Sequence, residues 1–405
     1  MYLMTFLLFS IPTLLVVIRL LLTLFPEKQL PDKMRVHKDV NYQPTVAVIV
    51  PCYNEGEGVY KTIKSVVESG YPLDKMVILP QDDGSVDDSW EWIQKAGREF
   101  PHVLPERNLE NRGKTETYLR AMERSDSEIV LIVDSDTIMG KDSINRMLSC
   151  FADERLGVVG APLSIINPDE NMLTAIQTYI YFFGLRFAKI SESHFRNVAV
   201  VGGFALAARR SILEGLAVKI RNRNWFGVPV KDGEDRFITH LSLLQGWETY
   251  VEQSAHVWTS ALNSYSRYFG QQLRWKRSLL RTYMWIIRTL PYHVRTMPAV
   301  ALLAVFGSGT IACIMFVGVL YELLFNPLGI LNPVKLLLWM AGACLVTIIC
   351  AHTAKLKDQV LRNPLKMVLF TAWWVVNLFY LVLLSFLYLD QDAWGNRTKK
   401  AQESA

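Results

Sequence analysis

TVAVIVPCYNE, residues Thr45 to Glu55, is a β-branched run that ends at a proline and passes straight into polar residues. Two further apolar runs of this kind follow, at Met76 to Pro80 and at Glu128 to Val133 (EIVLIV). Helical stretches separate them, notably Gly58 to Glu68 and Asp87 to Ala96. This alternation predicts an α/β domain. Ligands of such sheets bind beyond the carboxyl ends of parallel strands, so the polar residues after the three runs are the first candidates for a site.

The wider composition predicts a membrane protein with one large polar segment. The chain has 405 residues, of which 51% are hydrophobic, and a formal net charge of +5. A helix needs roughly 20 apolar residues to cross a bilayer. Four stretches approach that length: Leu3 to Phe25, Met297 to Leu320, Leu336 to Cys350 and Val368 to Leu387. The first lacks the basic start and the small-residue cleavage site of a secretory signal peptide, so we interpret it as a retained anchor.

The cysteines and the basic residues argue against two other classes of protein. The five cysteines form no CxxC pair and no Cys/His cluster, which argues against a zinc site or a disulfide framework. Lys and Arg are spread along the chain and do not form a stripe, so no nucleic-acid partner is predicted. The positive charge instead favours a cytosolic surface near a membrane, attracted to anionic lipid.

These patterns divide the chain into five segments: a membrane helix at 1–25, the polar segment at 26–263, amphipathic interfacial helices at 264–296, further membrane helices at 297–390 and a terminal segment at 391–405. Ser264 to Leu290 is long, basic and aromatic, as expected for a helix that lies in the membrane interface. Leu173 to Phe187 is a weaker example of the same pattern. The partner predicted for both is the lipid bilayer.

The distribution of Lys and Arg predicts that the polar segment lies in the cytosol. This segment and the loop Lys355 to Lys366 are both basic, whereas Met1 to Thr5 carries little positive charge. Four full spans would place the basic residues near the C-terminus outside, against the same rule. A re-entrant last apolar segment would remove the conflict, and the sequence leaves both arrangements open.

Four acidic clusters lie where an enzyme acting on nucleotide-activated sugars would need them. They are Cys52-Tyr53-Asn54-Glu55, Gln81-Asp82-Asp83-Gly84-Ser85, Asp134-Ser135-Asp136 and Gly233-Glu234-Asp235-Arg236. Departure of a nucleoside diphosphate requires positive charge, because no side chain readily protonates it. Asp134 and Asp136 could both face one ion, and their hard oxygen ligands suit Mg²⁺ or Mn²⁺. Taken alone, the triplet would be an ordinary polar loop.

The second cluster is the candidate nucleotide site. Asp82 and Asp83 precede a glycine that permits a tight turn, so one carboxylate could reach the base or ribose of a donor. An Asp-Gly turn without function is the alternative. Lys114, in NRGK, could add positive charge, although an exposed lysine at the start of a helix is common.

The fourth cluster supplies the candidate base. An acceptor hydroxyl must lose its proton as it attacks the anomeric carbon, so inverting transfer needs a carboxylate opposite the leaving group. We predict Asp235 in this role, with Glu234 as the less favoured substitute. Either would also suit the N-terminus of a helix, because FITHLSLLQG follows.

QQLRW, at the start of the predicted interfacial helix, adds a cation and an indole face. Arg274 could balance diphosphate charge, and Trp275 could stack on the apolar face of a sugar. Gln271 lies one helical turn before them. Taken alone, the motif would be an ordinary Arg and Trp pair at a membrane surface.

In order, VIVPCYNE, QDDGS, NRGK, DSD, GEDR and QQLRW resemble the pattern of processive family-2 glycosyltransferases, above all hyaluronan synthases and chitooligosaccharide synthases. The resemblance covers nearly all of Thr45 to Arg397. It implies an α/β GT-A (Rossmann-like) cytosolic glycosyltransferase domain, plus an α-helical transmembrane region with interfacial amphipathic helices. In that family the polymer is secreted through a membrane channel as it grows.

The resemblance also implies roles for single residues. Asp83 and Lys114 would contact the nucleotide, Asp134 the uridine diphosphate and Asp136 the metal, while Asp235 would be the base. Gln271, Arg274 and Trp275 would border the acceptor and the donor diphosphate. Trp394-Gly395-Asn396-Arg397 is similar to the WGTR segment that closes over the donor site, which makes Trp394 and Arg397 donor-binding candidates.

Two departures from the family pattern bear on the substrate. Asn396 replaces the threonine of WGTR, and Val201-Gly202-Gly203-Phe204-Ala205 replaces the cysteine-containing acceptor segment of hyaluronan synthases. By its position, Gly203 is an acceptor-binding candidate. The QQLRW motif and the single N-terminal span are also similar to those of chitooligosaccharide synthases. The acceptor sugar is therefore not determined by the motifs.

The function predicted is a plasma-membrane synthase that polymerises UDP-activated sugars into a β-linked polysaccharide, with UDP-GlcNAc and UDP-GlcA as donors. A single-donor chitin, chitooligosaccharide or β-glucan synthase is the alternative. A non-processive transferase with a lipid-linked acceptor is disfavoured by QQLRW and the spans after it. An inactive scaffold is disfavoured because Asp83, Asp134, Asp136 and Asp235 are all present. The sequence does not indicate protein partners.

Overall fold

The computed structural model describes residues 27–296 without a break, together with isolated positions at 18, 21–23, 302, 321, 324–325, 373 and 384–385. The chain divides into two compact units. The first consists of Val36–Asn167, Arg196–Ala261 and Asp390–Ala405, and the second of Met1–Arg35, Pro168–Phe195 and Leu262–Leu389. The first unit is the α/β unit and the second the helical unit.

A seven-stranded sheet forms the centre of the α/β unit, in the order β11-β6-β8-β4-β1-β2-β3. Its parallel part consists of β1 (Val46–Cys52), β2 (Met76–Asp82), β3 (Glu106–Arg107) and β4 (Ile129–Val133). Val46 pairs with Met76 on one side and with Ile129 on the other, so β1 lies between β2 and β4. The three apolar runs expected from the sequence are thus β1, β2 and β4.

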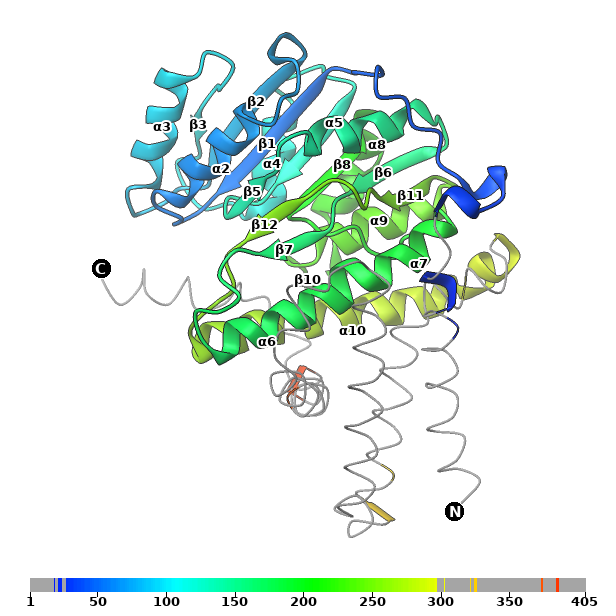
Figure 1. Cartoon of the computed structure of the whole chain (residues 1–405). Helices are drawn as coiled ribbons and strands as arrows, with labels where there is room; N and C mark the ends of the chain where they lie inside the picture. The colour runs from blue at the N-terminus through cyan, green and yellow to red at the C-terminus, as the bar shows by residue number, and fades with distance from the viewer. Residues whose placement is uncertain are drawn as a thin grey trace. The chain divides into compact units, whose positions relative to one another are not determined.

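Helices connect the parallel strands in an order that creates a switch in direction. They are α2 (Gly58–Val67), α3 (Ser89–Glu99) and α4 (Lys114–Met122). The chain passes from β1 through α2, β2 and α3 to β3, then returns through α4 to β4 on the other side of β1. α2 packs on α3, and α4 packs on β1 and on α8 (Arg210–Arg221) (Figure 1). Because helices cover the sheet, β1 and β4 are buried along their whole length, which explains their continuous apolar sequences.

The rest of the sheet is mixed. β8 (Ala205–Arg209) runs antiparallel to β4 and to β6 (Leu156–Gly160), and β11 (Glu248–Val251) pairs parallel with β6. α9 (Glu234–Leu244) packs on α8, β6 and β11. This packing fixes the N-terminus of α9, where the fourth acidic cluster lies.

Two small sheets and a short helix complete the α/β unit. β5 (Thr137–Met139), β12 (Val257–Thr259) and β7 (Leu163–Ile165) form one sheet, with β12 in the middle. β9 (Asn224–Trp225) and β10 (Val228–Pro229) form a hairpin between α8 and α9. The short helix is α5 (Ser143–Ser149).

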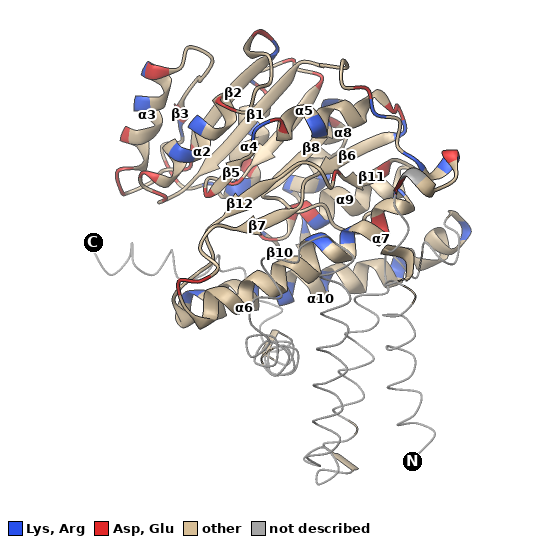
Figure 2. Ribbon diagram, viewed as in Figure 1, with Lys and Arg blue, Asp and Glu red and all other residues tan. Residues whose placement is uncertain are grey.

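The helical unit contains α6 (Met172–Tyr181), a π-helical turn (Phe182–Phe187), α7 (Ala188–His194) and α10 (Tyr265–Thr296). The predicted helix from Ser264 to Leu290 is α10, which has no acidic residue and carries Lys and Arg along its length (Figure 2). The weaker pattern at Leu173 to Phe187 is α6 and the π-helical turn. Within the described residues, no helix is both long and apolar enough to span a bilayer. The four predicted spans lie almost entirely outside the described residues.

Candidate active site

The switch in strand order places the candidate site of the α/β unit. The connections from β1 and from β4 lead to opposite sides of the sheet, so a crevice is expected between the carboxyl ends of these strands. Asp134 and Asp136 directly follow β4, and Asp82 and Asp83 lie at the same end of β2. Because β1 pairs parallel with both β2 and β4, the three acidic clusters that follow these strands lie at one edge of the sheet.

Lys114 joins two of these clusters by ion pairs. It is the first residue of α4, and its Nζ lies 2.5 Å from Oδ1 of Asp134 and 2.9 Å from Oε1 of Glu234. Burial alone would lower the pKa of Lys114, but the two carboxylates more than offset that effect and raise it. Lys114 is therefore a permanent positive charge within the acidic site.

Glu234 and Asp235 are adjacent but lie in different environments. Burial opposes ionisation of Glu234, yet Lys114 and Arg223 lower its pKa to about 2. The carboxylate of Asp235 accepts backbone N–H groups from Gly203 at 3.2 Å and Arg236 at 2.8 Å, and has no ion-pair partner among the described residues. Burial and the negative charge of Glu234 raise the pKa of Asp235. Of the two, Asp235 is the better proton acceptor.

Gly203 lies against Asp235 and Lys114. A Cβ atom at this position would lie 3.3 Å from Cβ of Asp235 and 3.3 Å from Nζ of Lys114. The next residue, Phe204, accepts the backbone N–H of Asp134 at 3.2 Å. The segment before β8 therefore closes one side of the site, and the small residue brings its backbone up to Asp235.

Asp83 lies beside the loop that leads to Lys114. Its side chain is buried, and its Oδ1 accepts from Nδ2 of Asn108 at 2.8 Å and from the backbone N–H of Arg112 at 2.9 Å. Oδ2 accepts from the backbone N–H of Gly113 at 2.8 Å. Asp83 thereby connects the end of β2 to the start of α4 and to the ion pairs of Lys114.

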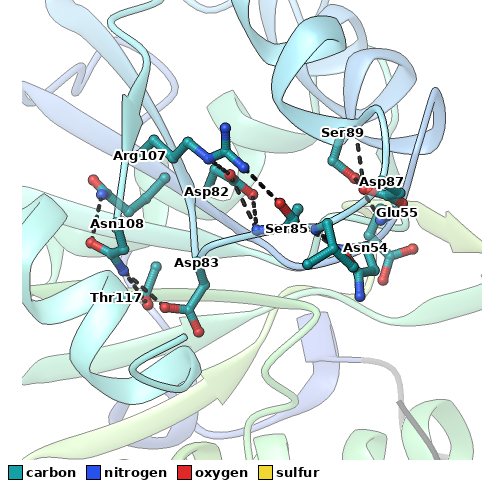
Figure 3. A network of polar contacts seen from close by, with 12 residues as sticks. Asn54, Glu55, Asp82, Asp83, Ser85, Asp87, Ser89, Arg107, Asn108 and Thr117 are labelled. Atoms are coloured by element: carbon teal, nitrogen blue, oxygen red, sulfur yellow. Dashed lines mark hydrogen bonds and ion pairs between the residues drawn. The ribbon is translucent and has the colours of Figure 1, made fainter. Parts of the chain in front are cut away.

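Asp82, the adjacent candidate, points to other partners (Figure 3). Its buried carboxylate forms an ion pair with Nε of Arg107 at 2.9 Å and accepts a hydrogen bond from the backbone N–H of Ser85 at 3.2 Å. Gly84 adopts a φ of +74°, and a Cβ there would lie 2.9 Å from the backbone of Glu110. The tight turn expected at Asp-Gly is therefore present, and Asp82 stabilises it.

The loop after β1 is hydrogen-bonded to the loop after β2 (Figure 3). The backbone N–H of Asn54 donates to Oγ of Ser85 at 3.0 Å, and Oδ1 of Asn54 accepts from the backbone N–H of Val86 at 2.9 Å. The N–H of Glu55 donates to Oγ of Ser89 at 2.8 Å. The first acidic cluster thus helps to position the second through its backbone N–H groups and the side-chain amide of Asn54.

The residues available for a divalent cation are few. Asp136 is exposed, and Asp134 is bonded to Lys114. Within the described residues, no group of three or more His, Cys, Asp or Glu side chains is arranged to hold a metal. One or two carboxylates nevertheless suit Mg²⁺ or a similar ion, which takes its other ligands from substrate phosphates and water.

The remaining candidates lie in other parts of the chain. Gln271, Arg274 and Trp275 are on α10 of the helical unit, at positions i, i+3 and i+4, so they share one helix face. The ring of Trp275 lies 5.7 Å from that of Tyr181 on α6. Trp394 and Arg397 lie outside the described residues.

Two buried side chains near the site have no motif that would have revealed them. Arg223 donates to Oγ1 of Thr115 at 3.0 Å and lies 5.7 Å above the ring of Phe237. Its positive charge helps to lower the pKa of Glu234. Asn108 contacts Asp83 as described above. Asn108 follows β3 and Arg223 follows the C-terminal end of α8, and the role of each depends on tertiary contacts.

Comparisons with known proteins agree with this fold. Residues 44–278 match the family described as Glycosyltransferase like family 2. A solved structure of a mannosyltransferase from Pyrobaculum calidifontis, in complex with GDP-Man and Mn²⁺, is similar with a TM-score of 0.63, covering 95% of this chain and 96% of that one at 18% sequence identity. The fold is therefore of the GT-A-like α/β type.

The family match covers more than half of the chain, and the protein belongs to the family-2 glycosyltransferases. Hyaluronan synthase from Streptococcus pyogenes is 28% identical over 363 residues, which cover 87% of this chain and 83% of the relative. An N-acetylglucosaminyltransferase from Mesorhizobium japonicum is 31% identical over 59% of this chain and 56% of its own length. The chain is a glycosyltransferase of hyaluronan-synthase-like type.

Proposed function

We propose that this glycosyltransferase is processive and inverting, and that it polymerises UDP-activated sugars into a β-linked polysaccharide of hyaluronan type from UDP-GlcNAc and UDP-GlcA. The observation that carries the catalytic step, inverting transfer with a carboxylate base, is the contrast between the adjacent carboxylates at the start of α9. Glu234 is ion-paired to Lys114, whereas Asp235 has a raised pKa and no ion-pair partner among the described residues. One carboxylate balances charge, and the other is available to accept a proton. Support for the hyaluronan type comes from the 28% identity to hyaluronan synthase over 87% of the chain.

In this mechanism the acceptor hydroxyl transfers its proton to Asp235 as its oxygen attacks the anomeric carbon. The bond from that carbon to the diphosphate oxygen breaks, and its electron pair leaves with UDP. Attack from the face opposite the diphosphate inverts the anomeric centre. Lys114 stabilises the negative charge that develops on the leaving diphosphate.

A Mg²⁺ or Mn²⁺ ion at Asp136 would supply further positive charge to the diphosphate. Support comes from the exposed carboxylate of Asp136 after β4 and from the Mn²⁺ and GDP-Man of the Pyrobaculum structure. Asp83, beside the NRGK loop, is the group we assign to the nucleobase. For Asp82 we keep only a supporting role in the donor site, because its carboxylate is bonded to Arg107 and Ser85.

The membrane assignment is part of the proposal. The similarity to hyaluronan synthase extends over 87% of the chain, well beyond the α/β unit. We therefore place the protein in the plasma membrane, with the α/β unit in the cytosol and the growing polysaccharide leaving through a channel of the same chain. Gln271, Arg274, Trp275, Trp394 and Arg397 keep their predicted acceptor and donor roles in this scheme.

A single-donor chitin or chitooligosaccharide synthase is the second candidate. It is favoured by the similarity to N-acetylglucosaminyltransferases, which reaches 31% identity. The two candidates share the base, the cation site and the nucleotide site. They differ in whether the product requires a uronic acid donor.

The test is product formation by the purified full chain in detergent with Mg²⁺ or Mn²⁺. UDP-GlcNAc alone, UDP-GlcA alone, both together and UDP-glucose are compared. Long product only with UDP-GlcNAc and UDP-GlcA together supports the hyaluronan type, whereas long product from one donor contradicts it and supports the second candidate. Asp235→Asn serves as the control: it should abolish product but bind UDP normally, and weak UDP binding would count against its assignment as the base.

A further inference from the structure

We infer that Asn108 is a positioning and specificity-determining residue. It donates a hydrogen bond that occupies an acceptor position on one oxygen of Asp83, so that the site accepts a uracil base and disfavours guanine. The inference rests on the proposed function, because it takes Asp83 as the group that meets the nucleobase. Asn108 follows the short strand β3 and is only 3% exposed. Neither the family match nor the motifs of the sequence assign it a role.

The hydrogen bonds of Asn108 fix its orientation. Its Nδ2 donates to Oδ1 of Asp83 at 2.8 Å and to Oγ1 of Thr117 at 3.1 Å, and its Oδ1 accepts from Nε2 of Gln81 at 3.2 Å. Its backbone N–H donates to the carbonyl of Asp82 at 2.8 Å. An ionised carboxylate can only accept hydrogen bonds, so the amide nitrogen must face Asp83. Figure 3 shows Asn108 and Thr117 together on one side of Asp83.

The acceptor capacity of Asp83 follows from these contacts. Oδ1 accepts from Asn108 and from the backbone N–H of Arg112, so both of its lone pairs are used. Oδ2 accepts from the backbone N–H of Gly113 alone. One acceptor position therefore remains, on Oδ2.

A single acceptor position discriminates between bases. Uracil presents one imide N–H, which matches it. Guanine presents two neighbouring N–H donors and would need both oxygens of the carboxylate for a bidentate contact. Cytosine presents an unprotonated ring nitrogen on the same edge, which a carboxylate repels. Without Asn108, a second acceptor position would open on Oδ1 of Asp83.

The experiment measures the binding of UDP, GDP and CDP to the full chain in detergent by titration calorimetry with Mn²⁺. The wild-type chain is expected to prefer UDP. Asn108→Leu should weaken UDP binding about three- to tenfold, as expected for a lost hydrogen bond to a charged group. It should lower the ratio of UDP to GDP affinity by about tenfold, because GDP gains an acceptor. Unchanged ratios in Asn108→Leu would overturn the inference.

Thr117→Val is the matched control. It removes one partner of Asn108 but leaves the bond from Asn108 to Asp83, so the ratio of UDP to GDP affinity should stay at the wild-type value. If Asn108 had a purely structural role, both variants would bind UDP and GDP more weakly, and by similar factors. In the Asp83→Ala background, Asn108→Leu should have no further effect on the ratio, because the effect is transmitted through Asp83.

Asn108→Ala covers the case in which leucine prevents folding. It also removes the donor to Asp83 but introduces a smaller side chain, so the ratio of UDP to GDP affinity should again fall, and an unchanged ratio would contradict the inference. Failure of the proposed function looks different: the wild-type chain would then prefer GDP or CDP, or bind no nucleotide, before any variant is compared.

Discussion

Nζ of Lys114 lies 2.5 Å from Oδ1 of Asp134, so the first residue of α4 neutralises the first carboxylate of the DSD triplet. The same ammonium group lies 2.9 Å from Glu234 on α9. A cation that belongs to the protein therefore already balances part of the negative charge that follows β4. A donor that binds here meets the positive charge of Lys114, which can stabilise the donor's diphosphate.

Replacing Lys114 with methionine should weaken donor binding and stability together. Asp134, whose side chain is partly exposed, would lose its ion-pair partner, while Glu234 would keep the positive charge of Arg223. Loss of one partner from a partly buried ion pair of this kind costs about 1 to 3 kcal/mol. UDP affinity should fall at least about tenfold, since a charge-assisted contact to the diphosphate is lost. Calorimetric titration and thermal unfolding check both effects.

Arg112→Gln is the control for the Lys114 variant. Arg112 lies two residues earlier, its side chain is 41% exposed, and its ion pair with Glu110 spans 3.4 Å. Surface pairs of this kind contribute little, so stability should change by less than about 1 kcal/mol. Normal UDP affinity in Lys114→Met would show that Lys114 does not contact the diphosphate.

The pH dependence of catalysis should report the raised pKa of Asp235. The base works only when ionised, so activity is lost as the pH falls through its pKa. Burial and Glu234 raise that pKa, so the acid limb of kcat/KM should lie above the usual carboxyl value of about 4. Arg236 and Lys114 oppose the shift.

Glu234→Gln tests the cause of this shift. It removes the negative charge beside Asp235, so the acid limb should move to lower pH even though maximal activity falls with the loss of the Lys114 ion pair. The rate profile is measured from about pH 4, near the usual carboxyl pKa, to about pH 9, where a lysine is still protonated. An acid limb that stays in place would assign the titration to another group.

The strands and the acidic clusters were predictable because their signals are local. Continuous apolar runs mark β1 and β4, which are covered on both faces, and the polar residues that follow them are necessarily at the strand ends. Asp134 could therefore be placed from the sequence. The pairing of Asp134 with Lys114 could not, because it depends on α4 crossing to the other side of β1.

The different partners of consecutive carboxylates also could not be predicted from the sequence. Asp82 and Asp83 are consecutive, but one carboxylate turns to Arg107 and the other to Asn108, since successive side chains at a strand end point in opposite directions. The sequence already favoured Asp235 over Glu234 as the base, but it did not show what distinguishes their environments. The ion pair to Lys114 makes that distinction.

Gly203→Ala should reduce activity without unfolding the protein. The added methyl group would lie 3.3 Å from both Cβ of Asp235 and Nζ of Lys114, so these side chains must shift by a few tenths of an ångström. A displacement of catalytic groups on this scale should lower kcat about tenfold. Gly215→Ala is the control: it lies within α8 with nothing within 4 Å, so it should keep full activity and gain up to about 1 kcal/mol of stability. Full activity in Gly203→Ala would show that the site tolerates movement of its base.

Trp275→Ala should impair chain elongation more than donor hydrolysis. If the indole supports the acceptor sugar through its apolar face, its loss leaves donor binding and the attack of water largely intact while long product fails to form.

The competing explanation is packing, because the ring lies 5.7 Å from that of Tyr181 on α6. Tyr181→Ala separates the two. A packing role predicts that it reproduces the loss in Trp275→Ala, with elongation and hydrolysis falling together, whereas an acceptor role predicts that Tyr181→Ala retains more elongation and that Trp275→Phe, which keeps an aromatic face, recovers part of it. Both activities are measured on the same preparations, as UDP release and as polymer length, so that a loss of folded protein lowers the two equally and a loss of acceptor binding lowers only the second.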